Sequence, residues 1–436
     1  MTVLVFASLA LLSAAVWIYL VFAHGRYWLM DQHLPEVGAP DSGSPSEGWP
    51  RVVAIVPARD EADVLPLTLT TLLTQDYPGD FRIVLVDDAS TDGTSRVAEK
   101  LAAEHPGRTL EIVHSDGPPP GWAGKVAAMN RGFTTLATAT TTATVAAASS
   151  TATADAATAA AAAIAPEYVL FTDADIAHPA DSVRRLVSFG EARGLDLVSL
   201  MARLRTETTA ERAIVPAFVY SFAQLYPFRR VNRPGSHVGA AAGGCMLVRY
   251  DALVHAGGLA RIAGARIDDV ALGQLLKSAA PAEGGPRRDD TAGRTWLGLT
   301  VAVRSVRPYP RLADLWDMIA RSAYTQLRRS PLLLIGTLLG LLVMYAVPPV
   351  FGLAFLPAAL SSATSGGNAV TAASALSAWT LMSISYLPTL RLYGLRAWRA
   401  PVLPAVMMLY GAMTFDSALR HYRGRGGRWK GRVEQG

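Results

Sequence analysis

The chain has 436 residues, of which 51% are hydrophobic and 17% charged, and its formal net charge is +5. Its single cysteine, Cys245, excludes an intramolecular disulfide and is typical of a protein facing a reducing cytosol. The positive charge gathers near the end of the chain, and no other feature supports a nucleic-acid partner, so we expect none. This length suffices for one large domain, or two small ones, together with membrane segments.

The first apolar segment covers residues 2–23 and carries no charge. Its length is sufficient to cross a hydrocarbon core of about 30 Å. A cleaved signal peptide is the alternative, but no Lys or Arg precedes the apolar run and no A-x-A cleavage site is followed by a mature start. We expect a transmembrane anchor over residues 1–24 and a Pro/Gly/Ser-rich linker over residues 25–50.

A second apolar region covers residues 331–416. Residues 331–360 and 366–390 are uncharged, whereas residues 400–415 are apolar but short and contain two prolines. The tail that follows, residues 417–436, is rich in arginine, and such clusters beside a membrane mark the cytoplasmic side.

The basic tail constrains the membrane topology. If residues 24–330 and the tail both lie on the cytoplasmic side of the inner membrane, residues 400–415 cannot cross it. We therefore expect this block to be interfacial or re-entrant. The alternative is a hairpin broken at Pro348-Pro349, which would leave Arg391, Arg396 and Arg399 outside.

Residues 51–310 show strands alternating with helices. We expect strands over 51–58, 81–90 and 110–115, and helices over 61–75, over 95–105 and from residue 125. Such alternation implies a parallel sheet with right-handed crossovers. Residues 134–165, almost entirely Ala, Thr, Ser and Val, are expected to form a disordered surface insertion, and residues 279–293 a mobile loop, neither with a chemical role.

Two polar stretches follow the first two strands. PARDE, residues 57–61, is expected to end the first ladder at Pro57. Asp60 and Glu61 would then either bind a base or ribose or cap the next helix. VDDASTDGT, residues 86–94, is either an Asx-rich turn or places a carboxylate where it accepts the N–H of a uracil-type base. The residues alone leave both alternatives open.

FTDADI, residues 171–176, leaves a buried strand as D-x-D. In an extended chain Asp173 and Asp175 share a face, and two carboxylates at one point repel unless a cation or a proton lies between them. Hard oxygen ligands suit Mg²⁺ or Mn²⁺, whose shells are completed by diphosphate oxygens and water. The pattern favours a divalent cation site here.

RIDDVALGQLLK, residues 266–277, contains a further acidic pair, Asp268 and Asp269, just before an apolar-periodic helix. The pair either caps that helix or supplies a general base. The Gly/Ala-rich loop GAAAGGCMLVRY, residues 239–250, permits close backbone approach to a ligand, although tight packing alone would also select small residues.

In this order and spacing, PARDE, VDDASTDGT, GWAGK (121–125), FTDADI, GGCMLV and IDD (267–269) resemble the inverting nucleotide-sugar glycosyltransferases of family 2. The resemblance covers roughly residues 50–330. It implies the α/β GT-A fold, a Rossmann-like mixed sheet that binds nucleotide-diphospho-sugars, between N- and C-terminal transmembrane helices. A closer resemblance to the hopanoid-associated, HpnB-like subgroup is carried by VPAFVYSFAQLYPF (215–228), RSVRPYP (304–310), YTQLRRSP (324–331) and the basic tail.

The resemblance implies a role for each matching residue. Asp175 would be the direct ligand of a divalent cation, Mg²⁺ or Mn²⁺, with Asp173 beside it, and Asp269, next to Asp268, would be the catalytic base. Gln326, Arg329 and Trp122 would contact the diphosphate or the acceptor. The nucleotide sugar would be held by Pro57, Arg59, Asp60, Glu61, Asp87, Asp88, Lys125 and Asp173.

The resemblance also indicates what is transferred. Processive relatives carry Q-x-x-R-W, but here Ser330 replaces the Trp, which favours transfer of one sugar to a lipid acceptor over polymer synthesis. The alternatives are a processive polysaccharide synthase and a catalytically silent membrane scaffold. The sugar, the base, the acceptor and the oligomeric state are not specified by the sequence.

Residues 311–330 combine an apolar stripe with charges that lie largely off it. Such a helix can rest on the membrane surface or pack on a domain. Because it leads into the segment at Pro331, we expect an interfacial helix, with Trp316 on its lipid-facing edge, that helps a lipid acceptor to reach Asp269.

Overall fold

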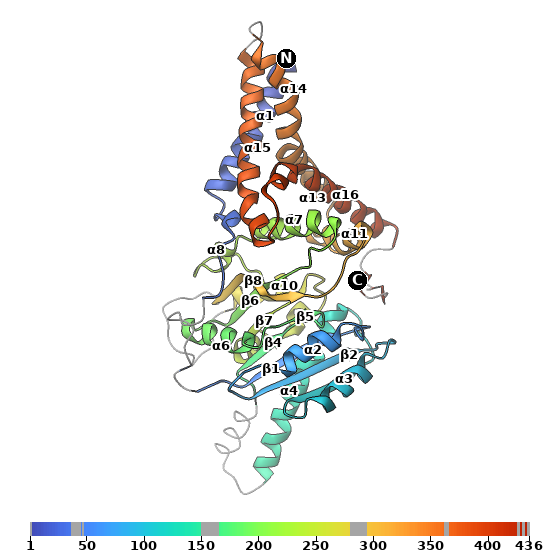
Figure 1. The fold of residues 1–436 in the computed structure, drawn as a ribbon. Coiled ribbons are helices and arrows are strands. Elements are labelled where there is room, and N and C mark those ends of the chain that lie inside the picture. The colour runs from blue at the N-terminus through green and yellow to red at the C-terminus, as the bar shows by residue number, and fades with distance from the viewer. Residues whose placement is uncertain are drawn as a thin grey trace. The chain divides into compact units, whose positions relative to one another are not determined.

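The computed structural model describes residues 2–35, 45, 48–149, 165–279, 294–361, 366–424, 428–429 and 432–433. The chain divides into two compact units. The helical unit comprises Met1–Asp31, Arg205–Arg230 and Pro308–Arg428, and the α/β unit comprises Gln32–Leu204, Val231–Arg307 and Trp429–Gly436. Each unit is described by itself (Figure 1).

The α/β unit is built on one eight-stranded sheet with the order β3-β2-β1-β4-β7-β6-β8-β5. Strands β1, β2, β3 and β4 are parallel to one another, whereas β7 is antiparallel to both β4 and β6, and β5 is antiparallel to β8. The sheet is therefore mixed, as the resemblance implied. Its strands are β1 Val52–Ala58, β2 Phe81–Asp88, β3 Thr109–Ser115, β4 Tyr168–Phe171, β5 Ile176–Ala177, β6 Leu197–Arg203, β7 Met246–Arg249 and β8 Thr295–Ser305.

The topology brings several strand ends to one edge. β6 and β8 are parallel to each other, and β7 runs opposite to both β4 and β6, so β8 has the direction of β1, β2 and β4. The carboxyl ends of these four strands meet at the edge where open α/β sheets bind ligands. The first residue of β7, Met246, starts at the same edge, because Met246 pairs with Phe171 at the end of β4.

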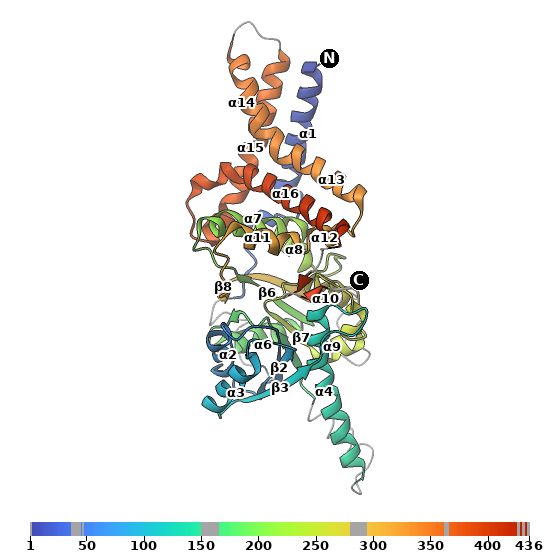
Figure 2. The same cartoon turned by 90° about the vertical axis from the view of Figure 1, so that its right-hand side faces the viewer.

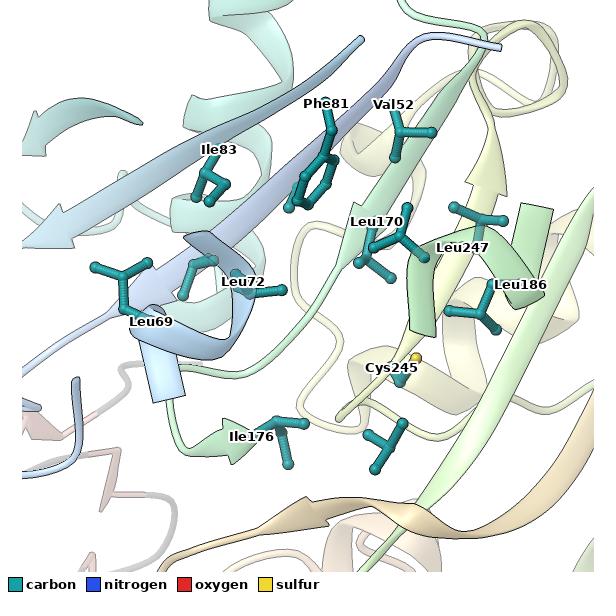
Figure 3. Packing of buried hydrophobic residues seen from close by; sticks show 14 of the residues in the cluster. Val52, Leu69, Leu72, Phe81, Ile83, Leu170, Ile176, Leu186, Cys245 and Leu247 are labelled. Carbon is teal, nitrogen blue, oxygen red and sulfur yellow. The ribbon is translucent and has the colours of Figure 1, made fainter. Parts of the chain in front are cut away.

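Helices cover both faces of this sheet. One hydrophobic cluster packs α2, α3 and α6 on Val52, Ala54 and Val56 of β1, and Figure 3 shows Leu69 and Leu186 within it. A second cluster packs α4, α9, η3 and α10 on the alternate strand residues. Apolar residues therefore face both sides of the strand, as expected for a buried strand. The helices of this unit are α2 Leu65–Leu73, α3 Thr94–Glu104, α4 Gly124–Ser149, α6 Ser182–Arg193, α9 Tyr250–His255, η3 Leu259–Ile262 and α10 Asp268–Ser278, while α8 Phe228–Val231 falls on the boundary, with its first three residues in the helical unit.

The strands and helices predicted between residues 51 and 133 lie within a few residues of the observed β1, α2, β2, α3, β3 and α4, with three corrections. Pro57 does not end the first ladder, because it pairs with Val86 and β1 continues to Ala58. Residues 61–64 form turns, so α2 starts only at Leu65. The backbone of α4 runs to Ser149, so the prediction of an irregular insertion is wrong up to that residue. Residues 150–164 and 280–293 lie outside the described residues.

A glycine in α10 sets its distance from the loop that precedes β7. A Cβ atom added to Gly273 would lie 2.3 Å from the carbonyl carbon of Ala240, which is a backbone atom that cannot turn aside. We expect Gly273→Ala to destabilise the α/β unit by about 1–3 kcal/mol, the usual cost of overpacking. Thermal unfolding would measure it, with Gly107→Ala as the control because nothing lies within 4 Å of that position. Equal midpoints for the two variants would contradict the close packing.

The helical unit contains four segments that are long and apolar enough to cross a membrane, among the residues described: Val3–Phe22, Pro331–Leu360, Gly366–Leu392 and Ala397–Tyr422. Helices α1, α14 and α15 run side by side, while α7, α11 and α16 lie crosswise to them (Figures 1 and 2). The elements are α1 Thr2–Phe22, η1 Tyr27–Leu29, α7 Thr209–Leu225, α11 Leu312–Ala320, α12 Ala323–Gln326, α13 Pro331–Leu341, η4 Leu342–Ala346, α14 Val347–Leu360, α15 Gly366–Leu392, η5 Ala397–Val402 and α16 Leu403–Tyr422. Short strands β9 Arg428–Trp429 and β10 Arg432–Val433 follow.

The structure bears on two membrane segments considered in the sequence analysis, the one that contains Pro348-Pro349 and the block over residues 400–415. Pro348-Pro349 does not break a hairpin, because the chain stays helical through a π-helical turn, η4, into α14. The two prolines lack backbone N–H groups, and the π-helical turn directly before them changes the hydrogen-bond register at this point of the helix. The block expected over 400–415 belongs to a longer helix, α16, which ends at Tyr422. Residues 397–422 are long and apolar enough to cross a membrane, so the interfacial or re-entrant position expected for this block stays a prediction.

The expected interfacial helix over 311–330 is broken in two, at Arg321 and Ser322. Leu315 and Ile319 of α11 are buried within the helical unit. Trp316 donates its indole N–H to Asp416 of α16, at 2.7 Å. The indole of Trp316 thus has a partner within the helical unit, and the lipid-facing position of this edge stays a prediction.

Candidate active site

The polar residues singled out in the sequence gather at the strand-end edge of the α/β unit. The loops after β1, β2 and β4, the loop before β7, the start of α10 and the end of β8 all contribute to this edge. Two cationic side chains, Lys125 and Arg307, organise most of its carboxylates.

The loop after β1 is held against the loop after β2. Arg59 donates from Nη1 to the carbonyl of Asp88 at 2.6 Å. Asp60 has a left-handed backbone (φ 50°), and its carboxylate accepts from the N–H of Thr91 at 2.8 Å. The N–H of Asp60 in turn donates to Ser90 at 3.0 Å. These reciprocal contacts hold the two loops as one surface.

The two aspartates at the end of β2 are buried. Asp87 accepts from the N–H of Ser90 at 2.9 Å and from the hydroxyl of Ser95. Asp88 accepts from the hydroxyl of Ser115 at 3.2 Å and lies 3.7 Å from Arg59. Asp87 therefore supports the turn, as an Asx-rich turn would require, whereas Asp88 connects β2 to β3 and to the loop after β1. Their part in holding a nucleoside stays a prediction.

Lys125, at the start of α4, connects the D-x-D to the acidic pair of α10. Its Nζ lies 2.6 Å from Asp173 Oδ1 and 3.1 Å from Asp268 Oδ2. Burial acts to lower the pKa of Lys125, but the carboxylates of Asp173 and Asp268 outweigh it and raise that pKa above its ordinary value. Lys125 therefore stays charged.

Arg307 forms the second bridge. Its Nη2 donates to both carboxylate oxygens of Glu61, at 2.7 and 2.6 Å, and its Nε donates to Asp175 Oδ2 at 2.8 Å. Burial acts to lower the pKa of Arg307, and the carboxylates of Asp175 and Glu61 raise it by more. The loop after β1 and the D-x-D thus share one guanidinium.

The sequence analysis assumed an extended chain at the D-x-D, and this assumption is wrong. Asp173 and Asp175 lie in the turn between β4 and β5, so the alternation of strand side chains does not apply to them. One carboxylate pairs with Lys125 and the other with Arg307. Burial raises the pKa of Asp173 to about 6, with Asp175 and Asp268 acting in the same direction and Lys125 against it.

Asp269, in the first turn of α10, is held differently. Its carboxylate accepts from the N–H of Gly243 at 2.9 Å and from its neighbour Val270 at 2.8 Å, and it has no ion pair among the described residues. Burial raises the pKa of Asp269 to about 6, with repulsion from Asp268 adding to it and Lys125 opposing it. A half-buried carboxylate with such a pKa can take a proton near neutral pH.

The site has the chemistry of a cation site that needs a ligand to complete it. Among the described residues, Lys125 pairs with Asp173 and Asp268, Arg307 pairs with Asp175 and Glu61, and Asp269 lies beside them, so five carboxylates are gathered around two cations. Among the described residues, no three His, Cys, Asp or Glu side chains are arranged to hold a metal by themselves. Mg²⁺ and Mn²⁺ suit such a site, because they use one or two carboxylates and take the rest from phosphate and water.

The remaining predicted residues lie outside this cluster. Pro57 is within β1, and Trp122 packs against the hydrophobic cluster around α4 and α10. Gln326 and Arg329 belong to the helical unit, where Gln326 contacts the hydroxyl of Tyr226 and Arg329 has a left-handed backbone (φ 54°). The predicted contact of Gln326 and Arg329 with the diphosphate or the acceptor stays a prediction.

The sequence reasoning missed several residues that shape the cluster. Arg307 was noted only as part of RSVRPYP and was assigned no role. A charged residue directly after a strand, as for the aspartates after β2 and β4, could have marked it as a site residue. The N–H of Gly243 and the buried His178 were also missed. His178 lies 2.9 Å from the hydroxyl of Thr172, which donates to the carbonyl of Gly244 and so ties the strand before the D-x-D to the glycine loop.

Comparison with known families supports what these residues suggest. A family described as glycosyltransferase-like family 2 matches residues 50–282, more than half of the chain. The chain belongs to glycosyltransferase family 2. The match contains the loops after β1, β2 and β4 and the start of α10, but not Arg307 or the helical segments at either end of the chain.

Several solved structures are similar to this glycosyltransferase. The mannosyltransferase PcManGT from Pyrobaculum calidifontis, in complex with GDP-Man and Mn²⁺, is 18% identical with a TM-score of 0.48, over 95% of this chain and 99% of that one. S. aureus TarS 1-349 with UDP-GlcNAc is 13% identical with a TM-score of 0.35, over 88% and 97%. Glucosyl-3-phosphoglycerate synthase from Mycobacterium tuberculosis, with Mn²⁺, UDP-Glc and phosphoglyceric acid, is 16% identical with a TM-score of 0.36, over 64% and 79%. The donors and ions named here are those of the three proteins.

Proposed function

We propose that this family 2 glycosyltransferase moves one hexose from a nucleotide-diphosphate sugar to a lipid acceptor, by an inverting displacement assisted by a divalent cation. The observation that carries the proposal is the state of Asp269. Of the five carboxylates at this edge, Asp269 is the one that accepts from two backbone N–H groups and forms no ion pair among the described residues. A general base needs such a position, because a neighbouring cation in direct contact would hold its proton affinity too low.

The other residues of the cluster orient the donor in this proposal. Asp60, Glu61 and Asp88, on the joined loops after β1 and β2, would face the nucleoside. Lys125 and Arg307 are charged donors suited to phosphate oxygens. Asp269 would take the proton from the acceptor hydroxyl as that oxygen attacks the anomeric carbon from the face opposite the leaving diphosphate.

Asp173 and Asp175 would hold the divalent cation. When bound, such an ion supplies positive charge that stabilises the leaving nucleoside diphosphate. The two carboxylates fit this task because they lie on one turn at the strand-end edge, where a diphosphate would complete the coordination.

The pH dependence of transfer would report the base. Because Asp269 acts only when deprotonated and its pKa is raised to about 6, kcat/KM should be constant above that pH and fall about tenfold per unit below it. Asp268→Asn removes a negative charge beside Asp269 and so lowers the pKa of Asp269. The acid limb of the kcat/KM profile should therefore move to lower pH. Rates measured from pH 5 to 8 with both proteins would show this. An unmoved limb in Asp268→Asn would assign it to another group.

The lipid acceptor is proposed from the helical unit. A chain with four apolar helices long enough to cross a membrane holds its catalytic unit near lipid, and the charge pattern favours a cytoplasmic position on the inner membrane. The resemblance to the HpnB-like subgroup favours a hopanoid or another polyprenoid as the acceptor class. Leu312, which is exposed on α11, is a residue that the bilayer interface could cover.

Purified full-length protein in nanodiscs that contain bacterial lipid extract would test this function. We expect Mn²⁺-dependent transfer of labelled sugar from one of several nucleotide sugars into the solvent-extractable lipid. Leu312→Glu should weaken transfer to lipid and spare Mn²⁺-dependent donor hydrolysis, since only an exposed apolar contact changes. Label in a high-mass polymer would favour a processive synthase, and no turnover of any donor would favour a silent scaffold.

A further inference from the structure

Arg307 stands where two motifs of the cluster meet. Its guanidinium contacts both oxygens of Glu61, from the loop after β1, and Oδ2 of Asp175, from the D-x-D. The same Asp175 oxygen also accepts from the hydroxyl of Ser305 at 3.3 Å. Asp175 Oδ2 is therefore fully used by residues from the end of β8.

The backbone fixes this arrangement. Val306 donates its N–H to the carbonyl of Asp175 at 2.9 Å, and β8 pairs with β5 directly after the D-x-D. The N–H of Arg307 donates to the hydroxyl of Ser305 at 3.3 Å. The main chain of Arg307 is thus fixed beside Asp175, so that a change of partner would involve its side chain alone.

A divalent cation on Asp175 would meet this guanidinium. Coordination requires a carboxylate oxygen at about 2.1 Å from Mg²⁺, whereas Arg307 Nε lies 2.8 Å from that oxygen. Two positive groups on one carboxylate repel strongly in a half-buried site, because little solvent screens them. Arg307 also has a nitrogen, Nη1, without a hydrogen-bond partner in the part of the chain that is described, and this nitrogen can donate to an anion.

We propose that Arg307 is a positioning residue with two alternative partners: it bridges Asp175 and Glu61 in the free enzyme, and it leaves Asp175 for the donor's diphosphate when a divalent cation takes its place. The inference rests on the proposed role of Asp175 as a metal ligand. It makes binding of the cation and binding of the diphosphate mutually supportive, because each removes the obstacle to the other.

The binding of Mn²⁺ alone to the full-length protein, followed by electron paramagnetic resonance, tests the first half without any turnover. Arg307→Met should bind Mn²⁺ about tenfold more tightly than wild type, since a competing charge is removed. Arg307→Lys, which keeps the charge, should stay near wild type. Arg304→Met removes the same charge from an exposed position on β8 and should leave the affinity within about twofold. A merely structural arginine predicts the opposite, because its loss would disorder Asp175 and weaken Mn²⁺ binding.

Inorganic pyrophosphate tests the second half. At saturating Mn²⁺, Arg307→Met should bind pyrophosphate about tenfold more weakly than wild type, because a charge-assisted contact is lost. Unchanged or weaker Mn²⁺ binding, or unchanged pyrophosphate binding, would overturn the proposal. If Arg307→Met does not fold, Arg307→Gln replaces it in both measurements. Asp175→Ala separates this failure from that of the proposed function: if Asp175→Ala binds Mn²⁺ as wild type does, the metal role itself is wrong.

Discussion

Asp269→Asn is expected to lower kcat for sugar transfer by about a thousandfold, because a positioned general base contributes about 10²- to 10⁴-fold. Asparagine has the shape of aspartate, and its side-chain oxygen can still accept from the N–H of Gly243. It cannot take a proton from the acceptor. Donor affinity should therefore change little while turnover is lost, which steady-state rates and donor titration would measure together.

Asp251→Asn is the matched control, since Asp251 is also an acidic residue in the first turn of a helix, α9, and is exposed. Its rate should stay at the wild-type value. If Asp269→Asn keeps more than a tenth of wild-type turnover, Asp269 is a capping residue of α10 and the base is another group.

Asp175→Ala is the second large effect. If the site loses its cation, the leaving diphosphate loses its counter-charge, and a loss of several kcal/mol in the transition state corresponds to about a thousandfold in rate or more. Excess Mn²⁺ should restore part of the activity, because the remaining ligands still bind weakly. Transfer rates across a range of Mn²⁺ concentrations would separate this effect from misfolding.

Asp181→Ala removes one carboxylate from the start of α6, close in sequence but outside the cluster, and should be harmless. A rate for Asp175→Ala within about threefold of wild type would exclude the metal role, because direct ligands cost far more than that.

Much of the α/β unit could be predicted, because its pattern is local. Buried strands such as Val52–Ala58 are continuous apolar runs, and the acidic pair before α10 marks a helix start. The edge on which the motifs meet followed from the parallel alternation alone. The order of the motifs then identified the family.

The contacts that give the cluster its chemistry could not be predicted in this way. Arg307 reaches Glu61 across 246 positions of the chain, and no local periodicity records such a pair. The turn conformation of the D-x-D depends on β5 pairing with β8, a non-local contact. The break between α11 and α12, at Arg321 and Ser322, also depends on packing within the helical unit. There the N–H of Tyr324, at the start of α12, donates to the hydroxyl of Ser417.

The anomeric configuration of the transferred sugar tests the central claim most directly. A single displacement by an acceptor hydroxyl that Asp269 deprotonates inverts the anomeric centre, so the product should have the configuration opposite to that of the donor. Proton nuclear magnetic resonance of the lipid product, from the coupling constant at the anomeric carbon, gives the answer in one measurement. Inversion is the result expected if Asp269 activates the acceptor directly, and a product with the donor's own configuration would contradict the mechanism proposed for this site.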